Sequence, residues 1–110
     1  VNSRVELAQA QAVLQQRRNR ELMHAGVTLE APATTLVGPD CPIGGDTVLH
    51  GGVRIEGGTV IGRACRIEAN CVLRGCRLGD GVTVGANSVL HGGDFPAGTI
   101  VHPLTARSAD

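Results

Sequence analysis

The sequence predicts a mainly β protein, a parallel β-helix of about three coils preceded by one long α-helix. Three observations support this class. A six-residue period of aliphatic residues runs from Val37 to Leu90, residues 3–25 have the composition and end signals of a helix, and aromatic residues are nearly absent. With one Phe and no Tyr or Trp in 110 residues, the interior must be narrow, because ordinary cores depend on aromatic side chains.

Residues 3–25 form the first predicted element, a single helix. Ser3 followed by Glu6 is a capping box, in which each side chain satisfies a free backbone N–H group near the start of the helix. The stretch 7–22 is rich in Ala, Gln, Arg, Leu and Glu and has no Gly or Pro. Gly26 stands where a left-handed residue ends a helix. The apolar stripe is thin, so we interpret the helix as a strut between domains.

From residue 37 the chain divides into units of six residues, one of which has only five. Every unit starts with an aliphatic residue: Val37, Ile43, Leu49, Ile55, Ile61, Ile67, Leu73, Leu78, Val84 and Leu90. The fifth position of most units is small or β-branched: Cys41, Thr47, Val53, Thr59, Cys65, Cys71, Val82 and Ser88. Cys76 comes one residue early in the short unit. This is a hexapeptide repeat, and its fixed period is typical of a solenoid.

Three such units close one triangular coil, with the aliphatic side chain inside and the small residue near a corner. Ten units therefore predict about three coils. Glycine follows the first residue in half of the units, at Gly38, Gly44, Gly62, Gly79 and Gly85. We attribute these glycines to turns that need a positive φ. Prisms of this repeat class normally wind left-handed, against the general crossover rule, so we expect a left-handed β-helix.

Composition excludes several classes of protein. Ten Arg, no Lys and ten acidic residues give a formal charge of zero, which argues against a nucleic-acid partner. No apolar run approaches the roughly 20 residues of a membrane-spanning helix, so no membrane partner is expected. The chain begins with Val1 rather than Met, which predicts a piece of a longer protein or a processed product.

The junction before the repeats resembles one enzyme family. The run Val1-Asn2-Ser3-Arg4, a long helix, Ala25-Gly26-Val27-Thr28, Pro32 and the five-residue unit Leu73–Arg77 are similar to the domain junction of the bifunctional N-acetylglucosamine-1-phosphate uridyltransferase and glucosamine-1-phosphate acetyltransferase. The resemblance implies three segments. Residues 1–26 are the end of a nucleotidyltransferase domain and its linking helix, residues 27–101 are a partial left-handed β-helix, and residues 102–110 are an irregular tail.

The resemblance also implies a function and a partner. The family makes UDP-N-acetylglucosamine, a cell wall precursor, by transferring uridylyl from UTP and acetyl from acetyl-CoA to sugar phosphates, and it works as a cytoplasmic homotrimer. Asn2 matches a family ligand of the catalytic Mg²⁺, whose carboxylate partner lies upstream of this segment. The family's acetyl-transfer site needs Lys and Tyr, which this chain lacks. We therefore expect no complete catalytic or cofactor-binding site and no activity from this chain alone. The alternative is a trimerisation module without catalysis.

Three other sets of residues could have either a functional or a purely structural role. The four Cys could form disulfides or a zinc site, but no C-x-x-C occurs, and we interpret them as buried small residues in a reducing cytoplasm. His50 and His91 could be zinc ligands, yet their units predict different faces of the prism; His24 and His102 lie elsewhere. Arg17, Arg18 and Arg20 are interpreted as a solvated helix face. Further arginines are expected to point outward, at Arg54, Arg63, Arg66, Arg74 and Arg77.

Overall fold

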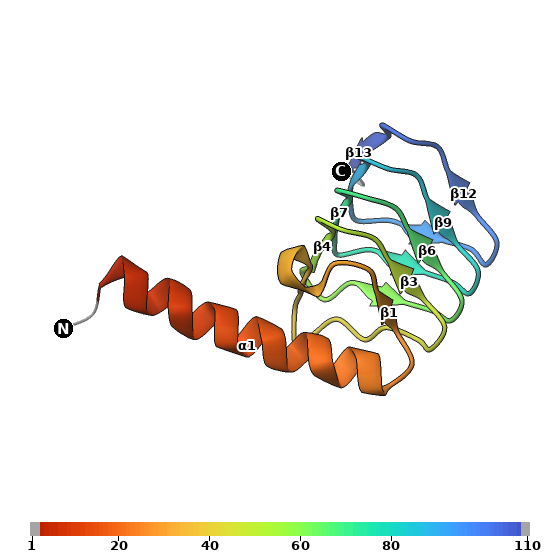
Figure 1. The fold of residues 1–110 in the computed structure, drawn as a ribbon. Helices are drawn as coiled ribbons and strands as arrows, with labels where there is room; N and C mark the ends of the chain where they lie inside the picture. Colours follow the sequence, from red (N-terminus) through yellow and green to blue (C-terminus); the bar gives the residue numbers. More distant parts are fainter. Residues whose placement is uncertain (1–2, 109–110) are drawn as a thin grey trace.

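The structure, a computed structural model, describes residues 3–108 as one α-helix followed by a solenoid of short parallel strands (Figure 1). Helix α1 spans Arg4–His24. The first sheet contains β1 (Thr28–Leu29), β3 (Val48–Leu49), β6 (Arg66–Ile67), β9 (Thr83–Val84) and β12 (Ile100–Val101). The second contains β2 (Leu36–Val37), β4 (Arg54–Glu56), β7 (Val72–Arg74), β10 (Val89–His91) and β13 (Ala106–Ser108). The third contains β5 (Val60–Ile61), β8 (Arg77–Leu78) and β11 (Asp94–Phe95).

From β3 onward, successive strands take the three sheets in turn, and in the first coil an isolated bridge from Ile43 to Ile61 stands in for the third strand. The chain therefore winds into stacked triangular coils. Two sheets have five strands each, which makes about five coils. The predicted class, a hexapeptide-repeat β-helix after one helix, is confirmed, but the predicted number of about three coils is wrong. The additional coils depart from the strict period. In the first coil, the short 3₁₀ helix η1 (Pro32–Thr34) lengthens the step between the inward residues Leu29 and Val37. The last coil begins with Val101, which lies beyond the counted units.

The hexad residues form the interior, as predicted. Nine of the ten unit-starting residues are buried, and the tenth, Ile43, packs partly buried against them. The small residues of the fifth position are buried as well, and so is Cys76. Register explains this pattern, because Leu49 lies beside Ile67, which lies beside Val84 in the next coil. Side chains of like size therefore stack along the axis of the solenoid and exclude water.

The explanation that the sequence suggests for the recurring glycines of the repeat is wrong. Gly44, Gly62 and Gly79 do not have a positive φ. A Cβ atom at Gly44 would lie 2.6 Å from the carbonyl carbon of Gly62 in the next coil, so glycine is needed there for close stacking. Positive φ angles occur at the corners instead, at Asp46, Gly52, Gly58, Ala64, Asn70, Gly75, Gly81, Asn87, Gly92, Gly93, Gly98 and Leu104, among others.

The end of the chain is also more regular than predicted. Residues 102–110 were expected to form an irregular tail, but Ala106–Ser108 form β13, which pairs in parallel with β10. The pairing places Arg107 beside Leu90. Backbone hydrogen bonding to the coil below supplies the order that this polar sequence does not indicate, as when Val89 N–H donates to Thr105 O at 2.8 Å.

The predicted ends of the helix are confirmed. The Ser3 hydroxyl oxygen accepts a hydrogen bond from Glu6 N–H at 3.1 Å, and Gly26 has a φ of 94°. Val27 N–H donates to Leu22 O at 3.0 Å, which closes the helix in a Schellman arrangement. Most of α1 extends away from the solenoid (Figure 1), and its buried residues are Asn19 and Leu22. Within residues 3–108, no helix has the length and apolar character that spanning a membrane requires.

Candidate functional site

The junction between α1 and the first coil has the most specific polar contacts of α1. The side-chain amide of Asn19, buried to 2% exposure, donates to Pro32 O at 2.8 Å and to Thr35 O at 3.1 Å. Its carbonyl oxygen accepts a hydrogen bond from Gln15 Nε2 at 2.8 Å. All three contacts are local to the end of α1 and the η1 segment. Asn19 therefore fixes the direction in which the helix leaves the solenoid.

Arg18 makes the second polar contact of this junction. Its guanidinium donates to Cys41 O at 2.8 Å and lies 3.7 Å from the Glu21 carboxylate. The prediction of a solvated basic face is therefore confirmed for Arg17 and Arg20, which are exposed, but is wrong for Arg18, which is partly buried. Neither Asn19 nor Arg18 is marked by a sequence motif, because their partners are backbone carbonyls that only the folded chain brings near.

A groove of about 510 Å³ lies between α1 and the second sheet. Its lining includes the apolar residues Leu14, Leu36 and Pro39 and the charged residues Arg17 and Arg54. Glu21 and Glu56 pair with the neighbouring arginines Arg18 and Arg54. The charged residues that line the groove are Arg17, Arg18, Arg54 and Glu21, so arginine is in excess, and none of the lining residues is a nucleophile with an activating base.

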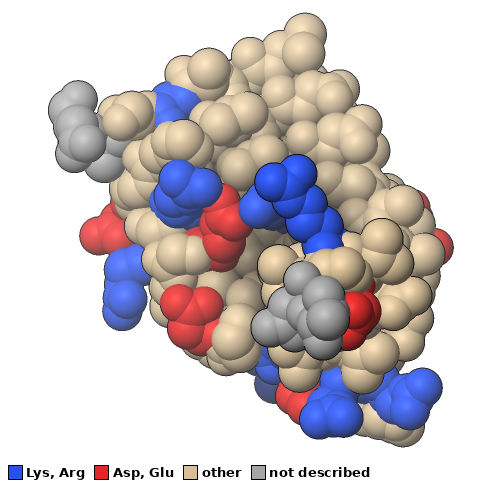
Figure 2. All heavy atoms as spheres, turned by 90° about the vertical axis from the view of Figure 1, so that its left-hand side faces the viewer, with Lys and Arg blue, Asp and Glu red and all other residues tan. Residues whose placement is uncertain are grey.

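The outward arginines of the second sheet form one ion-pair network. Arg54 Nε lies 3.0 Å from one oxygen of Glu56, and Arg74 pairs with the other. Hydrogen bonds from Arg74 and then Arg54 hold the pKa of the Glu56 carboxyl below its usual value. Figure 2 views the side from which α1 projects and shows basic and acidic side chains interspersed. All five predicted outward arginines are exposed, and in this network the single Glu56 carboxylate neutralises part of the charge of Arg54 and Arg74.

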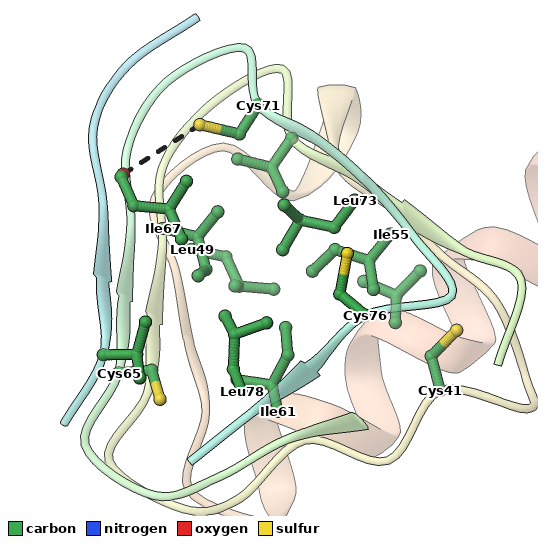
Figure 3. Packing of buried hydrophobic residues seen from close by; sticks show 14 of the residues in the cluster. Cys41, Leu49, Ile55, Ile61, Cys65, Ile67, Cys71, Leu73, Cys76 and Leu78 are labelled. Carbon is green, nitrogen blue, oxygen red and sulfur yellow. Dashed lines mark hydrogen bonds between the residues drawn. The ribbon is translucent and has the colours of Figure 1, made fainter. Parts of the chain in front are cut away.

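The four cysteines are free and buried, as predicted. Cys65, Cys71 and Cys76 lie at three different corners of the triangular interior (Figure 3). The Cys65 thiol donates to Gly79 O at 3.1 Å and the Cys71 thiol to Gly85 O at 3.2 Å, each in the next coil. Burial raises the pKa of the thiols of Cys41, Cys71 and Cys76. These thiols therefore pack and form hydrogen bonds, and they are poorly suited to act as nucleophiles.

The histidines are dispersed over the fold. His50 follows β3 of the first sheet, and its Nδ1 lies 2.7 Å from a carboxylate oxygen of Glu30 in the coil below. His91 ends β10 of the second sheet, so the prediction of different faces is confirmed. His24 ends α1 and His102 follows β12. Among residues 3–108, no group of three or more His, Cys, Asp or Glu side chains is placed to hold a metal ion.

Asn2, the predicted Mg²⁺ ligand, lies outside the described residues. The residues that the structure does describe offer no carboxylate cluster beside the start of α1 that would complete a magnesium site. The donor set of residues 3–108 therefore does not by itself fit a catalytic Mg²⁺.

Comparison with known proteins agrees with this arrangement. Residues 58–92 match the bacterial transferase hexapeptide (six repeats) family. The bifunctional protein GlmU of Pelobacter propionicus is 40% identical over 104 residues, which are 94% of this chain and 23% of that protein. The aligned region includes both α1 and most of the solenoid, because it covers nearly the whole chain. The chain is homologous to part of GlmU. This confirms the resemblance that the junction residues and the hexads indicate.

Other GlmU relatives give the same result. The protein of Syntrophotalea carbinolica is 46% identical over 92 residues, which are 84% of this chain and 20% of that protein. The protein of Desulfotalea psychrophila is 44% identical over 92 residues, again 84% of this chain but 27% of that protein. The chain thus spans about a fifth to a quarter of the curated relatives it matches. The same 92 aligned residues are 20% of one relative and 27% of the other, so these two GlmU proteins differ in length.

Proposed function

We propose that the chain serves a GlmU-type enzyme as its linking helix and first β-helix coils, and that it assembles as a homotrimer. One observation carries this proposal: the identity to GlmU proteins extends through both the helix and the solenoid. In such an enzyme, α1 would hold the preceding domain at a set distance from the coils. The Asn19 and Arg18 contacts support that role, because they fix the C-terminal part of α1 to the solenoid.

The whole enzyme would carry out two steps of UDP-N-acetylglucosamine synthesis. These are uridylyl transfer from UTP to N-acetylglucosamine 1-phosphate and acetyl transfer from acetyl-CoA to glucosamine 1-phosphate. We propose that this chain alone catalyses neither. The absence of Lys and Tyr from the sequence supports this for the acetyl step. For the uridylyl step, the support is the absence of a glycine-rich nucleotide loop followed by Lys.

The segment boundaries follow from the same proposal. Residues 1–26 would end the nucleotidyltransferase domain and link it to the β-helix of residues 27–101, to which β13 adds a further strand. Asn2 would offer its side-chain oxygen to Mg²⁺, a hard ion that prefers oxygen ligands, together with a carboxylate from the preceding domain. The buried free thiols suit a reducing compartment, so we place the protein in the cytoplasm.

Two measurements on the purified 110-residue chain test the proposal. A coupled assay for pyrophosphate released from UTP, with N-acetylglucosamine 1-phosphate and Mg²⁺ present, should detect no turnover; measurable turnover would overturn the inactive assignment. Light scattering after gel filtration should give three times the chain mass of 11.3 kDa. A monomer at all concentrations would contradict the role in assembly, because a trimer must bury side faces of the solenoid.

The competing function is a hexapeptide module that trimerises without belonging to an enzyme. It predicts the same trimer and the same inactivity, so the two assays do not separate it from the enzyme segment. The coding sequence before Val1 separates them. A reading frame that encodes a glycine-rich nucleotidyltransferase start supports the enzyme, whereas a start codon directly before Val1 supports the module.

A further inference from the structure

α1 and the second sheet enclose a corner on one side of the solenoid (Figure 1). The groove at the base of this corner is lined by Leu14 of α1 and Leu36 of β2, which are 61% and 43% exposed. Leu7 is 59% exposed, and it lies on the same face of the helix as Leu14 because seven residues make about two turns. The apolar face of α1 therefore continues from the groove along the projecting part of the helix.

The second sheet is the most apolar side of the solenoid. Strand pairing aligns its outward residues in one row, which contains Leu36, Arg54, Val72, Val89 and Ala106. The row of the first sheet contains Thr28, Val48, Arg66, Thr83 and Ile100, and that of the third sheet contains Val60, Arg77 and Asp94. Four of the five residues in the second sheet are apolar, against two of five in the first and one of three in the third. Apolar groups gathered on one exposed side mark a contact surface.

Arginine is in excess in this corner. Arg17, Arg18 and Arg54 line the groove, whereas Glu21 is the acidic residue of its lining. The chain as a whole has a formal charge of zero, so acidic residues on other surfaces balance this excess. A partner with an acidic side would therefore complement the corner.

The first sheet is a side of this kind. Glu30 follows β1 and Glu68 follows β6, two coils further along, and Arg66 is the arginine in the outward row of that sheet. Ile100 in the same row is 68% exposed and adds an apolar group. In the third sheet, by contrast, one outward arginine and one outward aspartate cancel.

A second copy of this chain fits the corner in size as well as in charge. A cyclic trimer brings two different sides of each copy into contact, because its interfaces are heterologous. The part of α1 from Arg4 to Leu14 rises about 15 Å, and a six-residue side of one coil is at most about 20 Å long. The projecting helix is therefore long enough to lie along most of one side of a second solenoid.

We propose that the corner between α1 and the second sheet receives the first-sheet side of a second copy of the chain. The helix of each copy then contacts its neighbour, and the third sheet faces solvent. This inference rests on the proposed homotrimer and adds to it the sides that meet. It also gives α1 a second role, because its apolar face takes part in assembly as well as in linking two domains.

The test adds one positive charge inside or outside the corner. Leu14→Arg and Val89→Arg place it on the helix and on the sheet of the corner, where Val89 is 39% exposed. Val13→Arg is the matched control on α1, since Val13 is 52% exposed but does not line the groove, and Val60→Arg is the control on the third sheet. Circular dichroism confirms that each variant is folded.

Gel filtration with light scattering over a dilution series measures the trimer. Leu14→Arg and Val89→Arg should each raise the concentration at which the trimer dissociates by at least about tenfold, because an unpaired charge is buried in the contact. Val13→Arg and Val60→Arg should dissociate as the wild type does. If Leu14→Arg or Val89→Arg does not fold, Leu7→Arg on the projecting part of α1 replaces it.

Three results would overturn this inference, and they are distinguishable. A wild-type trimer that either corner variant leaves intact at the same concentrations shows that another side forms the contact and leaves the proposed homotrimer standing. Equal loss of the trimer in a control variant shows that the sides are wrongly assigned. A wild-type chain that is monomeric at every concentration contradicts the proposed homotrimer and the corner contact together.

Discussion

Replacing Gly44 by alanine tests the physical basis of the coil stacking. The new Cβ atom would lie 2.6 Å from the carbonyl carbon of Gly62, 2.7 Å from its oxygen and 2.7 Å from Arg63 N. All three are backbone atoms, so no side chain can rotate to make room. The two coils must separate locally, although neighbouring strands are normally only about 4.8 Å apart.

The expected cost has two parts. Overpacking a rigid interior costs about 1–3 kcal/mol. Separation also weakens the hydrogen bond from Gly44 N–H to Ile61 O, now 2.9 Å, which adds about 1 kcal/mol. Alanine restricts the unfolded chain and returns about 0.4–1 kcal/mol. We therefore expect Gly44→Ala to lower the free energy of unfolding by about 2–3 kcal/mol, or the melting temperature by about 8–15 °C for a domain of this size.

The neighbouring glycine provides a matched control. A Cβ atom at Gly45 would be 3.7 Å from Ala25 O and 3.7 Å from Arg63 Nη2, which are ordinary contacts, and Gly45 has no positive φ. Gly45→Ala should therefore change the free energy of unfolding by less than about 1 kcal/mol, in the stabilising direction. Urea unfolding of both variants at one protein concentration makes the comparison. Equal stabilities for Gly44→Ala and Gly45→Ala would refute the stacking explanation.

Three further predictions concern the junction, a corner and the charged face. Asn19→Ala leaves the carbonyls of Pro32 and Thr35 without their donor and should cost about 2–4 kcal/mol in urea unfolding, whereas the exposed Gln16→Ala should cost less than about 0.5 kcal/mol. Ala64 has a φ of 55°, so Ala64→Gly should stabilise the fold by about 0.5–1 kcal/mol in thermal melts; a lower melting temperature would contradict this. The lowered pKa of Glu56 means that its ion pairs stabilise the fold above the ordinary pKa of 4.5 and that this contribution is lost as the pH falls. Glu56→Gln should therefore be less stable than wild type at pH 7, and the difference in denaturation midpoint should shrink toward about pH 3; a constant difference would count against the ion pairs.

Much of the fold follows from local patterns. The aliphatic hexads predict which side chains are inside, and nine of those ten residues are buried. Ser3 and Gly26 predict the ends of α1 because capping depends on residues within one turn. The number of coils was missed because η1 interrupts the period before Val37 and because Phe95 and Val101 follow outside the counted units. A coil can be counted from the sequence only where both the aliphatic residue and the six-residue spacing repeat.

The contacts of the candidate junction could not be predicted from the sequence. Asn19 and Arg18 bind backbone carbonyls of residues 32, 35 and 41, and any residue type has a carbonyl, so no motif indicates these contacts. Likewise, Arg107 is an ordinary polar residue until its pairing places it above Leu90. For the glycines, the sequence shows where they recur but not why, since a Cβ clash involves a coil some 17 or 18 residues away.

The repeat, its inward residues and the resemblance to the bifunctional family can be predicted without coordinates, because they depend on side-chain type and spacing along one chain. The number of coils, and the attachment of the helix through Asn19 and Arg18, are visible only in the folded chain. The physical reason is that stacking brings together backbone atoms that are distant in the chain. The hydrogen bonds and close contacts between coils depend on that stacking, and the period of the residues along the chain does not reveal them.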